Sequence, residues 1–226
     1  MSWMQTNAKQ TDTPARRRSI AGIEARDRLL DTAERLLGES GLEGVSLRQI
    51  GAATGQGNNS AVQYHFGDKA GIISAIIERR VASFEARRQD LLESAQSTAD
   101  PPDLRALLKV IFLPLAEATA PDGQHVYVRF ISQFLSRIQY QESMEHPGWD
   151  KASAATRAVA LLGEQLPFLG EAQLGARINR AGGLFFNALI DRDNALAQGR
   201  KVELEPLFFA DVFSMMAAAI AAPIGA

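Results

Sequence analysis

The amino-acid sequence predicts an all-α protein of about nine helices, with a three-helix N-terminal head and a larger C-terminal helical domain. Apolar residues recur at helical spacing along most of the chain, and capping signals precede several of these stretches. Few runs alternate between apolar and polar residues. The 226 residues, of which 46% are hydrophobic and 22% charged, have room for one or two cores, which excludes disorder throughout.

The composition excludes several classes of protein and site. Lys and Arg number 24 and Asp and Glu number 26, so the net charge is -2 and binding to a polyanion requires a local basic patch. The absence of Cys excludes disulfide scaffolds, cysteine-ligated metal sites and thiol nucleophiles. We find neither a signal peptide nor an apolar run of the roughly 18 residues that a membrane span needs, so we expect a cytoplasmic protein.

The first 70 residues predict an arm followed by a head. Residues 1–20 are expected to form a flexible basic arm, and Ile23–Leu37 has the spacing of an amphipathic helix that ends in the glycines of GESGLEG. Ser46 and Gln49 form a capping box at the start of a short helix. Val45 and Ile50 are placed to form its hydrophobic staple. Glycines then permit a turn before a third helix, SAVQYHF, so residues 21–70 predict a helix-turn-helix domain.

Residues 71–226 predict a second domain made only of helices. Asp68 is placed to cap a long helix that extends to about Glu93. The short run VYVRF is compatible with a strand, but its neighbours favour a helix. Further helices are expected over 104–119, with Pro114 as a kink, and over 126–139, 149–166, 171–197 and 206–222.

The third helix has one apolar and one polar face. Val62 and Phe66 lie four residues apart and are expected to pack inward, which turns Gln63 and Tyr64 outward. Such side chains are small enough to enter the major groove and carry groups that read base edges. An ordinary helical hairpin explains these residues equally well. The set expected to contact DNA, including groups that reach phosphates, is Ser46, Arg48, Asn58, Asn59, Ser60, Gln63, Tyr64 and Lys69.

The segment GLEGVSLRQIGAATGQGNNSAVQYHFGDKAGI resembles the DNA-binding domain of the tetracycline-repressor (TetR) family of transcriptional regulators. The resemblance covers roughly residues 21–77 and rests on the helix start VSLR, the run YHF and the pair Asp68-Lys69. Gly55 lies eleven residues before Phe66, one more than is usual in the family, and Gln63 replaces a usual tyrosine. The resemblance implies that Gln63 and Tyr64 face a double-stranded DNA operator. It also implies that His65 and Lys69 approach the DNA backbone and that Arg48 contacts a base or a phosphate.

The resemblance further implies that the C-terminal domain forms a homodimer and binds a small effector. Two apolar stripes on the last two helices are the expected dimer interface, although they are also compatible with the core of one chain. Their residues are Ile178, Leu184, Phe185, Leu189, Phe208, Val212, Met215 and Met216. An apolar or aromatic effector is expected to contact Phe112, Phe130, Phe134, Trp149, Phe168 and Asn187, with His125 and Gln133 as further polar anchors.

Three functions remain open from the sequence. The first is a repressor released from a near-palindromic operator by a small effector. The second is a DNA-binding regulator without such a ligand, controlled by a protein partner, and the third is a helical binding or enzyme domain. We expect no enzymatic activity, metal or cofactor, because the run GQGNNS follows a helix instead of the strand that dinucleotide binding requires, and no GxSxG motif occurs.

Overall fold

The computed structural model describes residues 14–55, 60–138 and 152–224, with the side chains of residues 22–55, 62–136 and 152–224. Regular structure in these ranges consists of nine α-helices without strands, which confirms the predicted fold class. The head contains α1 (Pro14–Gly44), α2 (Leu47–Ala53) and α3 (Ser60–Phe66). The body contains α4 (Lys69–Thr98), α5 (Leu104–Glu117), α6 (Val126–Ile138), α7 (Ala154–Gln165), α8 (Glu171–Ala197) and α9 (Glu205–Ala221).

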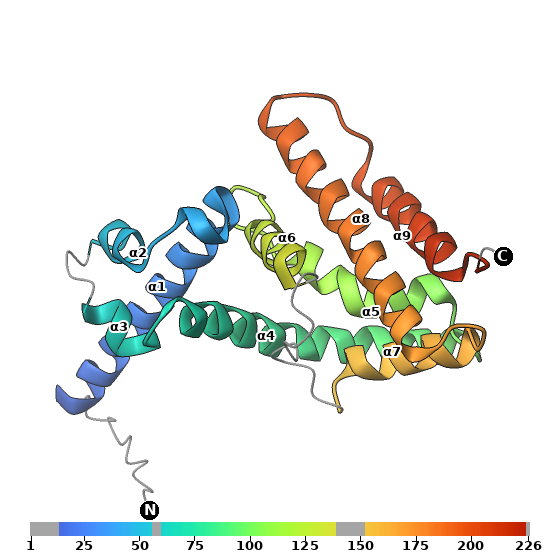
Figure 1. Cartoon of the computed structure of the whole chain (residues 1–226), viewed down its shortest axis with the longest axis horizontal. Helices are drawn as coiled ribbons and strands as arrows, with labels where there is room; N and C mark the ends of the chain where they lie inside the picture. The colour runs from blue at the N-terminus through green and yellow to red at the C-terminus, as the bar shows by residue number, and fades with distance from the viewer. Residues whose placement is uncertain (1–13, 56–59, 139–151, 225–226) are drawn as a thin grey trace, which may run out of the picture.

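The helices form an elongated molecule with the head at one end (Figure 1). Helices α2 and α3 pack beside α1, and the long helix α4 leads from the head into the body. Helix α6 packs against α1, while α5 packs between α4 and α7. Helices α8 and α9 form a pair at the opposite end from α2 and α3. The head is therefore joined to the body through both α4 and α6.

The predicted capping groups adopt the expected geometry. The Gln49 backbone N–H donates to Ser46 Oγ at 3.3 Å, and the Ser46 backbone N–H donates to Gln49 Oε1 at 2.7 Å, which completes the capping box of α2. Val45 and Ile50, the residues of the staple, are both buried in the apolar core. Asp68 caps α4 by accepting a 2.8 Å hydrogen bond from the Gly71 backbone N–H.

Several helix boundaries differ from the sequence prediction. Helix α1 already begins at Pro14, so part of the segment expected to be an arm is helical, and the helix is interrupted at Gly41. Helix α4 continues to Thr98, because the apolar positions Leu92 and Ala95 extend its buried face by more than a turn. Helix α7 starts at Ala154 and not near Trp149, since Ser153 caps it through the Thr156 N–H. Trp149 itself lies outside the described residues.

The buried apolar side chains form one connected core from α1 to α9, with Phe130, Phe185 and Phe213 as its largest fully buried members. Where α1 crosses α6, Gly38 permits a close approach of the two backbones. A Cβ atom at Gly38 would lie 3.1 Å from the Phe130 backbone nitrogen and 3.2 Å from Arg129 Cβ. This contact fixes the position of the head on the body. No helix in the described ranges is both long and apolar enough to cross a bilayer.

Candidate nucleic-acid interface and effector cavity

Helix α3 presents a polar edge to solvent and an apolar edge to the head. Val62 is fully buried, and the Phe66 ring lies 5.3 Å from the Arg26 guanidinium of α1. Gln63 is exposed and Tyr64 is 86% exposed. The division between inward and outward residues predicted for this helix is therefore present. It leaves Gln63 and Tyr64 free to contact another molecule.

The remaining residues expected at DNA surround α3 to different degrees. Ser46 and Arg48 are exposed at the start of α2, while Lys69 is half-buried at the start of α4. His65 is half-buried and its ring makes an edge contact with Tyr64 at 5.2 Å between centroids. Asn58, Asn59 and the side chain of Ser60 lie outside the described part of the chain. The lengthened turn therefore stays a prediction from the sequence.

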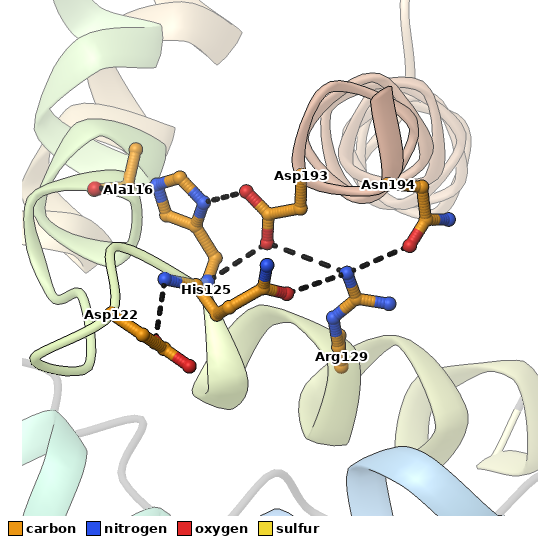
Figure 2. A network of polar contacts seen from close by, with 7 residues as sticks. Ala116, Asp122, His125, Arg129, Asp193 and Asn194 are labelled. Carbon is orange, nitrogen blue, oxygen red and sulfur yellow. Dashed lines mark hydrogen bonds and ion pairs between the residues drawn. The ribbon is translucent and has the colours of Figure 1, made fainter. Parts of the chain in front are cut away.

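A polar network joins the start of α6 to α8 (Figure 2). The His125 ring lies between Asp193 Oδ1, 2.7 Å from Nδ1, and the Ala116 carbonyl oxygen, 3.0 Å from Nε2. The His125 backbone N–H donates to Asp193 Oδ2 at 2.8 Å, and Arg129 donates to Asn194 at 3.0 Å. Asp193 is only 1% exposed. These groups connect three helices and are engaged with one another, and the expected role of His125 as a polar anchor stays a prediction.

The electrostatics of Asp193 follow from these contacts. Burial by itself raises the pKa of this carboxyl group, but the hydrogen bonds from His125 and the charge of Arg129 outweigh burial. The pKa of Asp193 is therefore lower than its ordinary value of 3.8. The network holds a carboxylate in its ionised form. Within the described residues, no group of three or more His, Asp or Glu side chains is placed to hold a metal ion.

A cavity of about 120 Å³ lies among helices α4 to α8. Of the residues expected to contact an effector, only Phe112 lines it. Phe130 and Phe134 are core residues, Phe168 is 47% exposed and Asn187 is exposed. Trp149 is outside the described ranges. Most of the wall is apolar, and its polar side chains include Arg88, Tyr127, Asn179, Ser153 and Thr156.

Sequence reasoning missed Arg88 and Tyr127, which are both nearly buried. Arg88 is 9% exposed and Tyr127 is 3% exposed. An arginine in the charged run EARRQD reads as a surface residue, and Tyr127 falls in a run that reads as core. One signal was available: Phe84, Arg88 and Leu92 continue the inward i, i+4 register of α4. That register places a guanidinium in the interior.

The apolar stripes expected to form the dimer interface lie mostly inside the chain's own core. Leu184 is half-buried and Met215 is 43% exposed. The other six side chains have no surface left for a partner, because α8, α9 and α5 pack on one another. They are Ile178, Phe185, Leu189, Phe208, Val212 and Met216, each at most 7% exposed.

Ion pairs connect the head to the same helix that lines the cavity. The buried carboxylate of Glu34 on α1 accepts hydrogen bonds from Arg80 on α4 at 2.9 and 2.5 Å. Arg79 adds a 3.4 Å contact to Glu34 and a 2.7 Å ion pair with Asp31. Burial by itself lowers the pKa of Arg80, but its contacts with Glu34 outweigh burial and raise it. Helix α4 thus contacts the head and the cavity within about two turns.

Comparison with known proteins finds a family that the head resembles. Residues 29–76 match the family model described as bacterial regulatory proteins, tetR family, and this range includes all of α2 and α3. No curated protein matches the chain. A crystal structure described as that of a proposed TetR-family transcriptional regulator from Mesorhizobium loti is 12% identical, covers 89% of this chain and 95% of that chain, and has a TM-score of 0.48. Residues 29–76 of this chain are thus similar to the tetR family of bacterial regulatory proteins.

Proposed function

We propose that this protein is a cytoplasmic, dimeric transcriptional repressor that reads a near-palindromic operator through α3 and leaves it when a small molecule enters the cavity. The observation that carries the proposal is the exposed polar edge of α3, where Gln63 and Tyr64 project beside the buried Val62. Amide groups pair with adenine edges in the major groove, and a two-fold dimer reads two half-sites.

The contacts of α4 support control by a ligand. This helix contributes Lys69 near DNA, Arg79 and Arg80 to the joint with α1, and Phe84 and Arg88 to the cavity wall. A ligand that shifts α4 alters the spacing of the two heads in a dimer. Because both half-sites must be engaged together, a changed spacing lowers the affinity for the operator.

The exposed face of α9 supports a dimer. Leu207 is 59% exposed and Met215 is 43% exposed, and both lie on one side of the helix with Ala210, Ser214 and Ala218. Small residues between two apolar side chains allow a second helix to approach closely. We therefore assign the interface to this outer face of α9, together with Leu184 of α8.

Selection of bound duplexes from a random DNA pool tests the function. We expect enrichment of an inverted repeat with half-site centres one helical turn apart, about 34 to 36 Å. The variant Gln63→Ala serves as a matched control and should enrich a less specific repeat. If the protein enriches no duplex in dilute salt, the proposed function is refuted. A single enriched half-site would refute only the dimeric reading.

A further inference from the structure

The cavity contains a buried positive charge that makes no ion pair within 4 Å among the described residues. The Arg88 side chain is 9% exposed, and its only hydrogen bond within the described residues runs from Nη2 to the Ile111 carbonyl oxygen at 3.3 Å. Its Nε is fully buried and lacks a hydrogen-bond partner among those residues. Buried charges are normally paired, because an unpaired charge loses its hydration without compensation. Arg88 therefore has unused capacity to bind an anion.

Nearby acidic groups do not neutralise Arg88 directly. Glu85 lies one turn earlier on α4 and acts on Arg88 through its charge. Its Oε1 accepts a 2.7 Å hydrogen bond from the Ala154 backbone N–H, and its Oε2 is buried without a hydrogen-bond partner among the described residues. Glu85 does not line the cavity, and no carboxylate in the described ranges lies within 4 Å of the Arg88 guanidinium nitrogens. The Glu34 carboxylate is committed to Arg79 and Arg80. Among the described residues, the cavity side of Arg88 thus faces no carboxylate that lines the cavity.

A second unused donor lines the same cavity. Tyr127 is 3% exposed, and its ring packs against Phe84 at 5.6 Å between centroids, but its hydroxyl makes no hydrogen bond with any described group. Burial raises the pKa of this phenol, and the charge of Arg88 only partly opposes the effect. The hydroxyl therefore remains protonated and able to donate. A carboxylate accepts hydrogen bonds from both a guanidinium and a hydroxyl.

Apart from Asn179, Ser153 and Thr156, the rest of the wall is apolar, and it limits the size of a ligand. Phe112, Ile131, Val159 and Phe186 surround the space without offering polar groups. An apolar cavity of about 150 Å³ holds one benzene ring, so about 120 Å³ suits a single ring or a short chain. We propose that the cavity binds a small, mostly apolar carboxylic acid whose carboxylate contacts Arg88 and Tyr127. This proposal deepens the proposed function, since it assigns a chemical class to the effector.

Ligands of nearly one shape and different charge test the proposal on the full-length protein. Benzoate, benzamide and benzamidine carry a negative, zero and positive charge on the same ring, and butanoate with butanamide provides a short, flexible pair. We expect each carboxylate to bind about tenfold more tightly than its amide by calorimetry, and benzamidine not to bind. If neither carboxylate binds more tightly than its amide, the proposal is overturned.

Substitutions then locate the anion. Arg88→Met should remove the preference for the carboxylate, while the melting temperature of the unliganded protein stays equal or rises because an unpaired buried charge is gone. Tyr127→Phe should reduce the preference by several-fold. Arg87→Met is the matched control, because this neighbouring guanidinium is exposed and paired with Glu117 at 2.7 Å. An unchanged preference in Arg88→Met would place the anion elsewhere and overturn the assignment.

The experiment separates the two proposals. Calorimetry measures the ligand without DNA, whereas fluorescence anisotropy on the selected duplex measures release from DNA. If neutral ligands release the duplex and carboxylates do not bind, the ligand class is wrong and the regulator stands. If carboxylates bind at Arg88 but no duplex is ever selected, the site assignment survives and the regulatory function is refuted.

Discussion

Arg80 on α4 directs both of its hydrogen-bonding edges at the carboxylate of Glu34 on α1, with Nε–Oε2 at 2.9 Å and Nη2–Oε1 at 2.5 Å. The same guanidinium lies 5.5 Å from the centroid of the Tyr127 ring. Since Tyr127 lines the cavity, one continuous set of contacts leads from the cavity to the helix that supports the head. A ligand against Tyr127 is thus two side chains away from α1.

Replacing Glu34 with Gln should weaken the joint between head and body. The substitution leaves Arg80 partly buried without its counter-charge, which costs about 2 to 4 kcal/mol. Urea unfolding at neutral pH measures this loss. Glu39→Gln is the control, because Glu39 pairs with Arg35 at an exposed position of the same helix and should cost less than about 0.5 kcal/mol. Equal losses in the two variants would contradict the importance of the buried pair.

Two substitutions in the head separate base reading from phosphate binding. Gln63→Ala should cost about 1 to 3 kcal/mol of operator affinity and relax specificity, because it removes an amide that pairs with a base. Lys69→Ala should weaken binding to all duplexes similarly and flatten the salt dependence by roughly one unit. Anisotropy titrations on operator and scrambled DNA across several salt concentrations measure both effects.

Lys201 supplies the control for the head variants. It is exposed in the connection between α8 and α9, outside the head. Lys201→Ala changes the net charge as Lys69→Ala does, but it should leave the salt slope unchanged. If Gln63→Ala and Lys69→Ala both bind DNA like the unmodified protein, the surface that contacts DNA lies elsewhere on the molecule.

Local signals in the sequence predicted the helices and the division of α3 into two faces. Ser46 and Asp68 cap the helices they were expected to cap, because a capping group and the N–H groups that it binds lie within three residues. Val62 is buried for a similarly local reason, since four-residue spacing fixes a shared face with Phe66. These features depend on short stretches of chain and are readable without the tertiary structure.

The cavity and the partner face depend on contacts between distant segments. The two apolar stripes, which contain Phe185 on α8 and Val212 on α9, are each compatible with either a core or an interface, and only the packing of α8 and α9 on α5 assigns them to the core. The residues next to Arg88 in the sequence are typical of an exposed helix surface. Arg88 is buried because α5 and α7 cover that side of α4. A single sequence does not contain that information.

Placing a charge on the outer face of α9 should prevent dimer formation. Met215→Glu introduces a carboxylate into a face that we assign to the interface, where an unpaired charge would lose its hydration. Light scattering of the variant should give the mass of one chain, against two for the unmodified protein. Leu196→Glu is the control, because Leu196 is 52% exposed near the end of α8, outside this face. If Met215→Glu remains dimeric, the assigned face is wrong.

Asp193→Asn should destabilise the protein by about 2 to 4 kcal/mol at neutral pH, because it removes the charged acceptor of a buried network. The pKa of Asp193 is lowered in the folded state, so its contribution is complete above its ordinary value of 3.8 and disappears as the pH falls through the folded pKa. The difference in free energy of unfolding between Asp193→Asn and the unmodified protein should therefore shrink only below about pH 4. Urea unfolding at pH 7, 5 and 3.5 measures it.

Asp191 provides the comparison for Asp193. It lies two residues earlier on α8 and is exposed. Asp191→Asn should change the free energy of unfolding by less than about 0.5 kcal/mol at each pH. If the difference in free energy of unfolding between Asp193→Asn and the unmodified protein stays constant down to pH 3.5, the pKa of Asp193 is not lowered in the folded state. This conclusion requires that the folded protein keeps the same contacts at pH 3.5, which near-ultraviolet circular dichroism checks.

Gly71 sets the tight turn that joins α3 to α4. A Cβ atom built at this position would lie 2.0 Å from the Phe66 carbonyl oxygen, which is a backbone atom and cannot rotate away. The Gly71 N–H also donates to the Asp68 side chain that caps α4. A methyl group at this position therefore pushes the end of α3 away from α4, in the part of the head that carries Gln63 and Tyr64.

Gly71→Ala should lower the free energy of unfolding by about 1 to 3 kcal/mol, the usual cost of overpacking, and should reduce operator affinity even where the protein remains folded. Gly175→Ala is the matched control, because a Cβ there meets nothing within 4 Å. It should stabilise α8 by up to about 1 kcal/mol through its higher helix propensity. Thermal unfolding and anisotropy on the selected duplex measure both. Unchanged stability and DNA affinity in Gly71→Ala would mean that the α3–α4 turn relaxes freely, and that the position of the reading face does not depend on it.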